Sequence, residues 1–158
     1  MGRICIFAGS GHGKSSAALG GALIRATQGE SVVVIQFLKG SGIGDSEFIK
    51  RLEPEIKVFH FEKSEENFDE LDEKHKEEEI INIKNGINYA RKVLSTGECD
   101  LLVLDEILGI VDMGIIDSEE LVSMLAQRDE NVDVIITGIN VDEKVSSIAD
   151  SVSVISMV

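Results

Sequence analysis

The sequence predicts a three-layer α/β fold built on a mostly parallel sheet. Short apolar runs alternate along the chain with segments of helical periodicity, which is the order of parallel strands joined by helical crossovers. The run VVVIQF, residues 32–37, is rich in β-branched side chains, as expected for a strand that is buried on both faces. The chain has no internal repeat and no low-complexity linker, so we expect residues 1–158 to form one domain.

The first predicted unit is a strand, a loop and a helix. Residues 3–7 form the strand, and residues 14–27 form a helix whose small side chains let it lie close to a sheet, with Gly29 past its end. The strand at residues 32–37 then completes a β-α-β unit, and the glycine-rich segment that follows it is expected to be a mobile loop.

A weaker strand at residues 56–61 and a long helix come next. The acidic run at residues 62–79 opens this helix, which ends at Gly97. We interpret the acids as a solvated helix start rather than a metal site, because carboxylates are favourable near a helix N-terminus. The core face of the helix is predicted from apolar residues at helical spacing: Ile80, Ile83, Ile87, Ala90 and Leu94.

The C-terminal half repeats the alternation of strands and helices. Residues 101–106 form a buried strand, Asp117 caps a helix, and residues 132–137 form another strand. A short helix over residues 145–149 then leads to a last strand at residues 152–155. Ligands in such sheets bind beyond the carboxyl ends of the strands. We therefore expect the glycine loop, the loop after Phe37, Asp105-Glu106 and Thr137-Gly138 to converge there.

Composition limits the partners. With 29 acidic against 15 basic residues and a net charge of −14, the surface repels nucleic acid and anionic membranes, so we expect neither as a partner. No apolar run approaches the roughly 20 residues of a membrane span, and no secretory signal is evident, so we expect a cytoplasmic protein. Cys5 and Cys99 lack metal-ligand spacing and are interpreted as packing residues.

The loop GSGHGKSS, residues 9–16, has the composition of a phosphate-binding loop. Glycines let backbone N–H groups curl around an anion, the following helix adds its dipole, and Lys14 supplies a mobile charge. Ser15 is placed to bind magnesium. The strict motif GxxxxGK[ST] is not met, because Ala8 occupies its first position. The candidate phosphate-binding residues are Gly9, Ser10, Gly11, His12, Gly13, Lys14, Ser15 and Ser16.

Asp105 and Glu106 end the apolar run LLVL. A buried strand that ends in carboxylates is typical of a Walker B segment, which holds Mg²⁺ or its waters at the sheet edge where a phosphate loop lies. Strands that end in acids are common, so the pattern gains weight from its pairing with Lys14 and Ser15 upstream.

Four segments together resemble a known family. FAGSGHGKSSAALG, VVVIQFLKG, LLVLDEI and VIITG, in this order, are similar to the ATP:corrinoid adenosyltransferases, the cob(I)alamin adenosyltransferase family with a RecA-type P-loop topology. The resemblance covers nearly the whole chain, and a small residue before Gly9 is itself a mark of the family.

The resemblance implies transfer of the 5′-deoxyadenosyl group of ATP to the Co(I) of a reduced corrinoid, with release of triphosphate. By match, Lys14 and the loop stabilise the leaving group, Ser15 and Glu106 hold Mg²⁺ with Asp105 close by, and Lys39 is a further basic group or a solvated lysine. The family relationship also implies a homodimer, and a reductase or corrinoid-protein partner.

The chain departs from the family pattern at several positions. His12, whose charge depends on pH, replaces a lysine, and Ile24 and Ile139 replace arginines, with Arg25 one place after the first. The family carries aromatics, often including a tryptophan, that help cobalt lose its lower ligand, and this chain has no tryptophan. Phe68 is the candidate for this role, or else it holds a loop in place. Phe59 and Phe61 are the other aromatics of that region. We expect a short form without the usual N- and C-terminal extensions.

Three functions therefore remain open from the sequence. The first is an adenosyltransferase that uses Lys14, Glu106 and Phe68 in catalysis. The second is a Mg-ATP-binding module that regulates or chaperones a corrinoid protein without catalysing transfer. The third is an ordinary phosphotransferase or ATPase with a phosphate loop.

Overall fold

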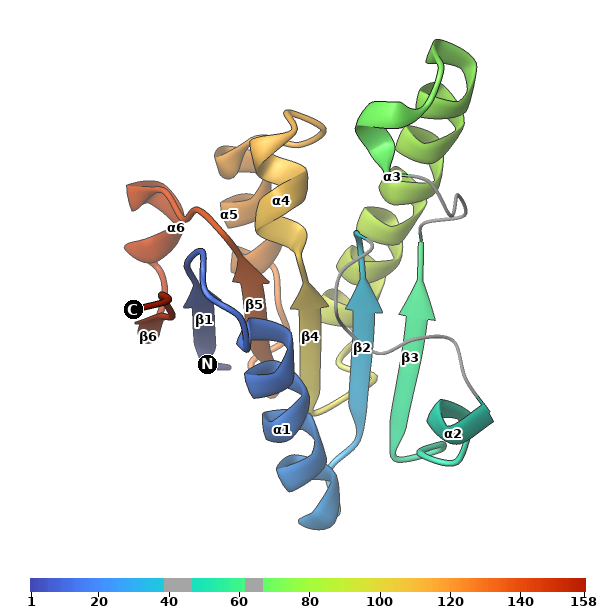
Figure 1. Cartoon of the computed structure of the whole chain (residues 1–158). Coiled ribbons are helices and arrows are strands. Elements are labelled where there is room, and N and C mark those ends of the chain that lie inside the picture. The colour runs from blue at the N-terminus through green and yellow to red at the C-terminus, as the bar shows by residue number, and fades with distance from the viewer. Residues whose placement is uncertain (39–46, 62–66) are drawn as a thin grey trace.

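A computed structural model of the chain describes residues 1–38, 47–61 and 67–158. Its centre is a six-stranded sheet in which every pairing is parallel, in the order β3-β2-β4-β5-β1-β6 (Figure 1). The strands are β1 (Ile4–Ala8), β2 (Val32–Gln36), β3 (Ile56–His60), β4 (Leu101–Asp105), β5 (Asp133–Gly138) and β6 (Ser151–Val154). The predicted parallel sheet is confirmed.

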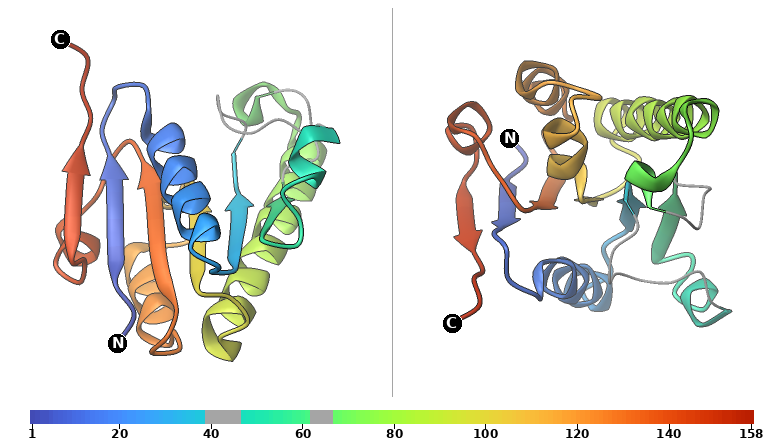
Figure 2. Two further views of the ribbon diagram at one scale, coloured as in Figure 1. Left: turned by 90° about the horizontal axis from the view of Figure 1, so that it is seen from below. Right: turned by 45° about the horizontal axis from the view of Figure 1, so that its top comes forward.

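Helices cover both faces of this sheet, giving three layers (Figure 2). Helix α1 (Lys14–Thr27) lies on one face, while α3 (Glu73–Thr96), α4 (Ile107–Asp112) and α5 (Ser118–Ala126) lie on the other. Shorter helical elements are α2 (Glu47–Lys50), η1 (Phe68–Glu70) and α6 (Glu143–Ser146). The three-layer α/β fold predicted from the sequence is therefore confirmed.

The core lies between these layers. Strands β2 and β4 are buried along their whole length, as the unbroken apolar runs predict. On one face, Ala18 and Ala22 let α1 approach Val34 and Val103 closely. On the other face, α3 buries Ile83, Ile87, Ala90 and Leu94 from its predicted stripe, whereas Ile80 is only partly buried.

The predicted helix and strand bounds agree with the structure within one or two residues, except at the start of α3 and at the end of α6, which stops at Ser146 rather than at residue 149. This helix begins at Glu73, where the carboxylate of Asp72 accepts a 2.8 Å hydrogen bond from the backbone N–H of His75. The prediction that the acidic run itself opens the helix is wrong for residues 67–72, because Asp72 provides the N-cap. Residues 62–66 and most of the glycine-rich loop after Phe37 lie outside the described residues.

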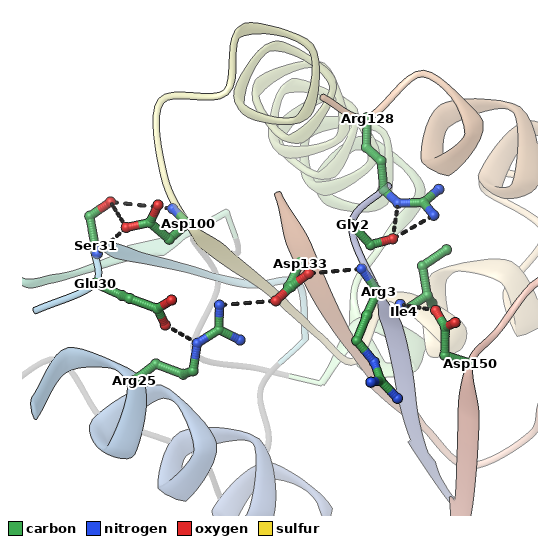
Figure 3. Close-up of polar contacts among 10 residues, drawn as sticks. All are labelled: Gly2, Arg3, Ile4, Arg25, Glu30, Ser31, Asp100, Arg128, Asp133 and Asp150. Atoms are coloured by element: carbon green, nitrogen blue, oxygen red, sulfur yellow. Dashed lines mark hydrogen bonds and ion pairs between the residues drawn. The ribbon is translucent and has the colours of Figure 1, made fainter. Parts of the chain in front are cut away.

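Carboxylates fix the amino-terminal edge of the sheet (Figure 3). Asp100, Asp133 and Asp150 accept hydrogen bonds of 2.8 Å from the backbone N–H groups of Ser31, Arg3 and Ile4, respectively. Hydrogen bonds to a charged acceptor are stronger than those between neutral groups. They hold neighbouring strands in register at this edge and leave the opposite, carboxyl edge for a ligand.

Within these described ranges, no helix has the length and apolar character that crossing a membrane requires.

Candidate phosphate-binding site

The loop between β1 and α1 depends on glycine for two different reasons. Gly9 and Gly13 have φ angles of 119° and 108°, in the region that L side chains rarely adopt. A Cβ at Gly9 would also lie 2.2 Å from the carbonyl oxygen of Ile155, whereas a Cβ at Gly13 would meet nothing within 4 Å. Gly13 is therefore required by the backbone turn alone, and Gly9 by the turn and by the neighbouring chain.

Two neighbouring segments hold this loop in place. The N–H of Gly9 donates to the carbonyl oxygen of Ile139 at 2.9 Å, and the N–H of Gly11 donates to that of Ile155 at 2.9 Å. These bonds tie the loop to the ends of β5 and β6. The contact between Gly11 and Ile155 could not be predicted from the sequence, because backbone atoms form it and it does not depend on the side chain of Ile155.

The loop borders a pocket of about 200 Å³, lined by residues 10–16 and Glu106. Gly13 is the N-cap of α1, and the first turn of that helix carries no acidic residue of its own, so the positive end of the helix dipole faces the pocket. The Lys14 ammonium donates a 3.0 Å hydrogen bond to the carbonyl oxygen of Gly11. This arrangement suits a bound phosphate chain.

The carboxylate of Asp105, at the end of β4, lies beside the loop. It is 5 % exposed and accepts hydrogen bonds from three side chains. Ser15 Oγ donates at 2.9 Å, Thr137 Oγ1 at 2.7 Å and Gln36 Nε2 at 3.2 Å. The predicted convergence of strand ends is confirmed for the loop, Asp105 and Thr137. Gln36 was missed, since an amide in an apolar run gives no signal of its own.

Glu106 has an unusual backbone. Its φ of 64° is the one positive value at a non-glycine residue in the described part of the chain. Its carboxylate lines the same pocket as Lys14. Burial raises the pKa of this carboxyl, Asp105 and Asp112 raise it further, and Lys14 lowers it. A bound cation would relieve the crowding of these carboxylates.

Comparison with known proteins identifies the family. The family model for ATP:corrinoid adenosyltransferase BtuR/CobO/CobP matches residues 1–158. The chain belongs to this family. It is 30% identical over 152 residues to the corrinoid adenosyltransferase of Escherichia coli K12. The matched region covers 96% of this chain and 75% of that protein.

Two further relatives are also corrinoid adenosyltransferases. That of Salmonella typhimurium is 29% identical over 152 residues, or 96% of this chain and 75% of the relative. That of Pseudomonas aeruginosa is 26% identical over 158 residues, or 99% of this chain and 76% of the relative. The resemblance noted in the sequence is thus confirmed.

The expected magnesium ligands of this adenosyltransferase are not equivalent. Ser15 hydrogen-bonds directly to Asp105, and the side chain of Glu106 makes no hydrogen bond to another described residue. Asp105 therefore lies next to Ser15, in agreement with the expectation that it is close to the Ser15–Glu106 pair.

Arg25 does not replace the family arginine. It forms ion pairs with Glu30 and, at 3.0 Å, with Asp133, at the amino-terminal edge of the sheet (Figure 3). That edge is opposite to the phosphate loop. Ile24 and Ile139, at the positions where the family has arginines, are apolar, and their side chains are 61% and 54% exposed, so neither supplies the charge of an arginine.

The aromatic candidates separate into two groups. Phe59 and Phe61 contact Tyr89 on α3, with ring centroids 4.9 and 6.1 Å apart, and so contribute to packing. Phe68 belongs to η1, and the Lys76 ammonium lies 5.7 Å from its ring centre. The segment η1 lies beside the start of α3, at the end of the molecule toward which the strands point (Figure 1). Lys39 lies outside the described residues.

The two cysteines have no site chemistry in this structure. Cys99 is buried, and burial raises the pKa of its thiol to about 12, which makes the reactive thiolate scarce. Cys5 is a partly buried residue of β1. Both positions agree with the packing role predicted from the sequence.

Proposed function

We propose that this chain, as one P-loop domain over residues 1–158, transfers the 5′-deoxyadenosyl group of ATP to the Co(I) of a reduced corrinoid and releases triphosphate. The observation that supports this most directly is the pairing of a phosphate loop with two carboxylates in a chain of the corrinoid adenosyltransferase family. ATP and a corrinoid are the substrates that the family description implies.

The proposed step needs no general base. A Co–C bond forms with both electrons from Co(I), the C5′–O bond breaks, and its electron pair leaves with the triphosphate. No proton is transferred, so catalysis depends on stabilising negative charge on the leaving group. Residues 9–16 offer backbone N–H groups and hydroxyls for the phosphates, and Lys14 offers a positive charge next to them.

The residues around Ser15 fit a magnesium ion. The Ser15 hydroxyl donates its proton to Asp105, which leaves its oxygen lone pairs free, and the Glu106 carboxylate lines the same pocket. Hydroxyl and carboxylate oxygens are the ligands that Mg²⁺ prefers. We propose that Ser15 and Glu106 hold the ion, with Asp105 orienting Ser15. When bound, Mg²⁺ neutralises charge on the triphosphate.

The corrinoid side of the proposal depends on Phe68. It is a partly buried aromatic of η1, and it is not among the rings that pack on Tyr89 of α3. A homodimer, a cytoplasmic location and a reductase or corrinoid-protein partner belong to the same proposal. We also propose that Lys39 is a second basic group near the triphosphate.

The two other functions considered from the sequence are less well supported. The relatives from Escherichia coli, Salmonella typhimurium and Pseudomonas aeruginosa are all named as transferases, which favours transfer over a regulatory module. Glu106 adds to this, because ATP binding alone does not require a partly buried carboxylate in the pocket of the phosphate loop.

An anaerobic assay tests the proposal. The protein is mixed with ATP, Mg²⁺ and chemically reduced cobalamin, and the corrinoid spectrum is followed. Appearance of the adenosylcobalamin spectrum supports transfer. Tight ATP binding without a new cobalt–carbon bond would instead identify a nucleotide-binding module, and steady release of ADP would identify an ATPase or phosphotransferase.

A further inference from the structure

We infer that Thr137 is a positioning residue that fixes both carboxylates of the site, and that it acts through Asp105 and Glu106 rather than by touching the substrates. The inference rests on the proposed function in one respect, namely that Mg-ATP is the ligand of the pocket. Thr137 is fully buried near the end of β5.

The strand order places Thr137 between the two halves of the site. Strand β5 lies between β1, which leads into the phosphate loop, and β4, which ends in Asp105. Thr137 pairs with Phe7 on one side, and on the other side it follows Ile136, the last residue of β5 in register with β4. Its side chain can therefore reach the carboxylate segment from a strand that also supports the loop.

The Thr137 hydroxyl is used in both directions. It donates to Asp105 Oδ1 at 2.7 Å and accepts from the backbone N–H of Glu106 at 2.8 Å. A single hydroxyl has one proton and two lone pairs, so these two bonds fix its orientation. Together they link the side chain of Asp105 to the main chain of Glu106.

The bond to Glu106 is made at a strained residue. A non-glycine residue with positive φ persists only where its surroundings hold it, and the φ of Glu106 is 64°. The N–H of Glu106 is held by Thr137, and its carbonyl oxygen accepts from the N–H of Gly109 at 3.0 Å. This backbone turn directs the Glu106 side chain into the pocket that Lys14 and Ser15 line.

The residue after Thr137 makes this arrangement possible. A Cβ at Gly138 would lie 2.3 Å from the Cβ of Leu108, so glycine there lets α4 pack directly on the end of β5. Close packing of α4 holds the Glu106 peptide within reach of the Thr137 hydroxyl. Gln36 completes the set from the other side, since its amide donates to Asp105 Oδ2 at 3.2 Å.

Variants of the whole chain of residues 1–158 test the inference. Thr137→Val removes the hydroxyl at nearly constant volume, Thr137→Ser keeps it, and Thr27→Val makes the same chemical change at an exposed position on α1. ATP affinity is measured by calorimetry with Mg²⁺ and with EDTA, and kcat and KM are measured for ATP and cob(I)alamin. Circular dichroism checks folding, and Thr137→Ala replaces the valine variant if that variant does not fold.

We expect Thr137→Val to bind ATP in EDTA like the wild type but to lose most of the affinity that Mg²⁺ adds. Its kcat should fall about 10- to 100-fold, the range found for groups that orient metal ligands, with the KM for corrinoid unchanged. Thr137→Ser should recover most of both properties. Thr137→Val should also add little to the loss caused by Glu106→Gln, because a residue that acts through another gives non-additive effects.

The inference is overturned if Thr137→Val keeps the full Mg²⁺-dependent gain in ATP affinity. It is equally overturned if Thr137→Ser is as impaired as Thr137→Val, or if the losses of Thr137→Val and Glu106→Gln simply add. A wild-type protein that binds Mg-ATP but transfers no adenosyl group would contradict the proposed function, and the binding measurements would still decide the role of Thr137.

Discussion

The hydroxyl of Ser15 donates to the carboxylate of Asp105 across 90 residues of sequence, with Oγ 2.9 Å from Oδ1 and 3.2 Å from Oδ2. Because Asp105 also accepts from Thr137 and Gln36, both of its oxygens are already occupied by protein donors. Glu106 is the acid whose side chain remains available in the pocket. We therefore propose different roles for the two adjacent carboxylates: Asp105 orients Ser15, and Glu106 faces the ligand.

The first prediction concerns the charge of Glu106. Its pKa is raised in the folded state by burial and by Asp105, so the folded protein binds the proton more tightly than the unfolded chain does. Stability therefore falls as pH rises from about the ordinary glutamate value through the folded pKa. Glu106→Gln does not titrate, so it should be more stable than the wild type at neutral pH, and its kcat should fall about 100-fold or more.

The measurement is urea unfolding of both proteins in EDTA between about pH 4 and pH 8. The stability advantage of Glu106→Gln should be smallest at the acidic end and should grow with pH. A difference that is independent of pH, or one that shrinks as pH rises, would contradict the account of Glu106.

The second prediction concerns Lys14. Lys14→Ala should weaken ATP binding about 10- to 100-fold, because a hydrogen-bonded charge at a phosphate contributes about 1.5–3 kcal/mol. Folding should be unaffected, since the described polar contact of this ammonium is one bond to the Gly11 carbonyl. Calorimetric titration with ATP checks affinity, with Lys50→Ala on α2, an exposed lysine, as the matched control. Unchanged affinity in Lys14→Ala would mean that this loop is not the triphosphate site.

The third prediction concerns Arg25. Arg25→Met removes the ion pairs with Glu30 and Asp133 and should lower the free energy of unfolding by about 1 kcal/mol, as is usual for partly exposed pairs. ATP affinity should not change, because these contacts lie at the amino-terminal edge of the sheet (Figure 3), whereas the phosphate loop follows the carboxyl end of β1. Arg51→Met, at an exposed position, is the control for both measurements. A large loss of ATP affinity in Arg25→Met would instead show that this arginine contributes to nucleotide binding.

The fourth prediction concerns Phe68. Phe68→Ala should reduce kcat/KM for the corrinoid about 10-fold, the equivalent of ~1.4 kcal/mol for one lost aromatic contact, while ATP affinity stays at the wild-type value. Phe48→Ala is the control, since Phe48 is 63% exposed on α2. Equal kinetics for Phe68→Ala and the wild type would leave Phe68 a residue that merely pins its segment of chain.

Much of the fold was predictable because local signals agree with one another. Helix α1 matches the predicted residues 14–27, since glycines mark both of its ends. The meeting of Ser15 and Asp105 follows from a general rule, namely that parallel strands bring their carboxyl ends to one edge. Neither inference needs knowledge of which strands are neighbours.

The remaining features depend on tertiary contacts. The insertion of β5 between β1 and β4 makes Thr137 the link between both halves of the site, and the order of strands cannot be read from periodicity. The positive φ of Glu106 could not be predicted from the sequence. Positive φ angles are normally predicted from glycine, and this position holds a glutamate. Helix α4 was not predicted, since LGIV continues the apolar composition of the strand before it.

The fate of the triphosphate tests adenosyl transfer most directly, and phosphorus NMR follows it. One turnover with ATP, Mg²⁺ and cob(I)alamin under anaerobic conditions should give inorganic triphosphate in an amount equal to the adenosylcobalamin formed, with no ADP. Release of ADP and inorganic phosphate, or an ATP spectrum that does not change while cob(I)alamin is present, would contradict adenosyl transfer by this chain.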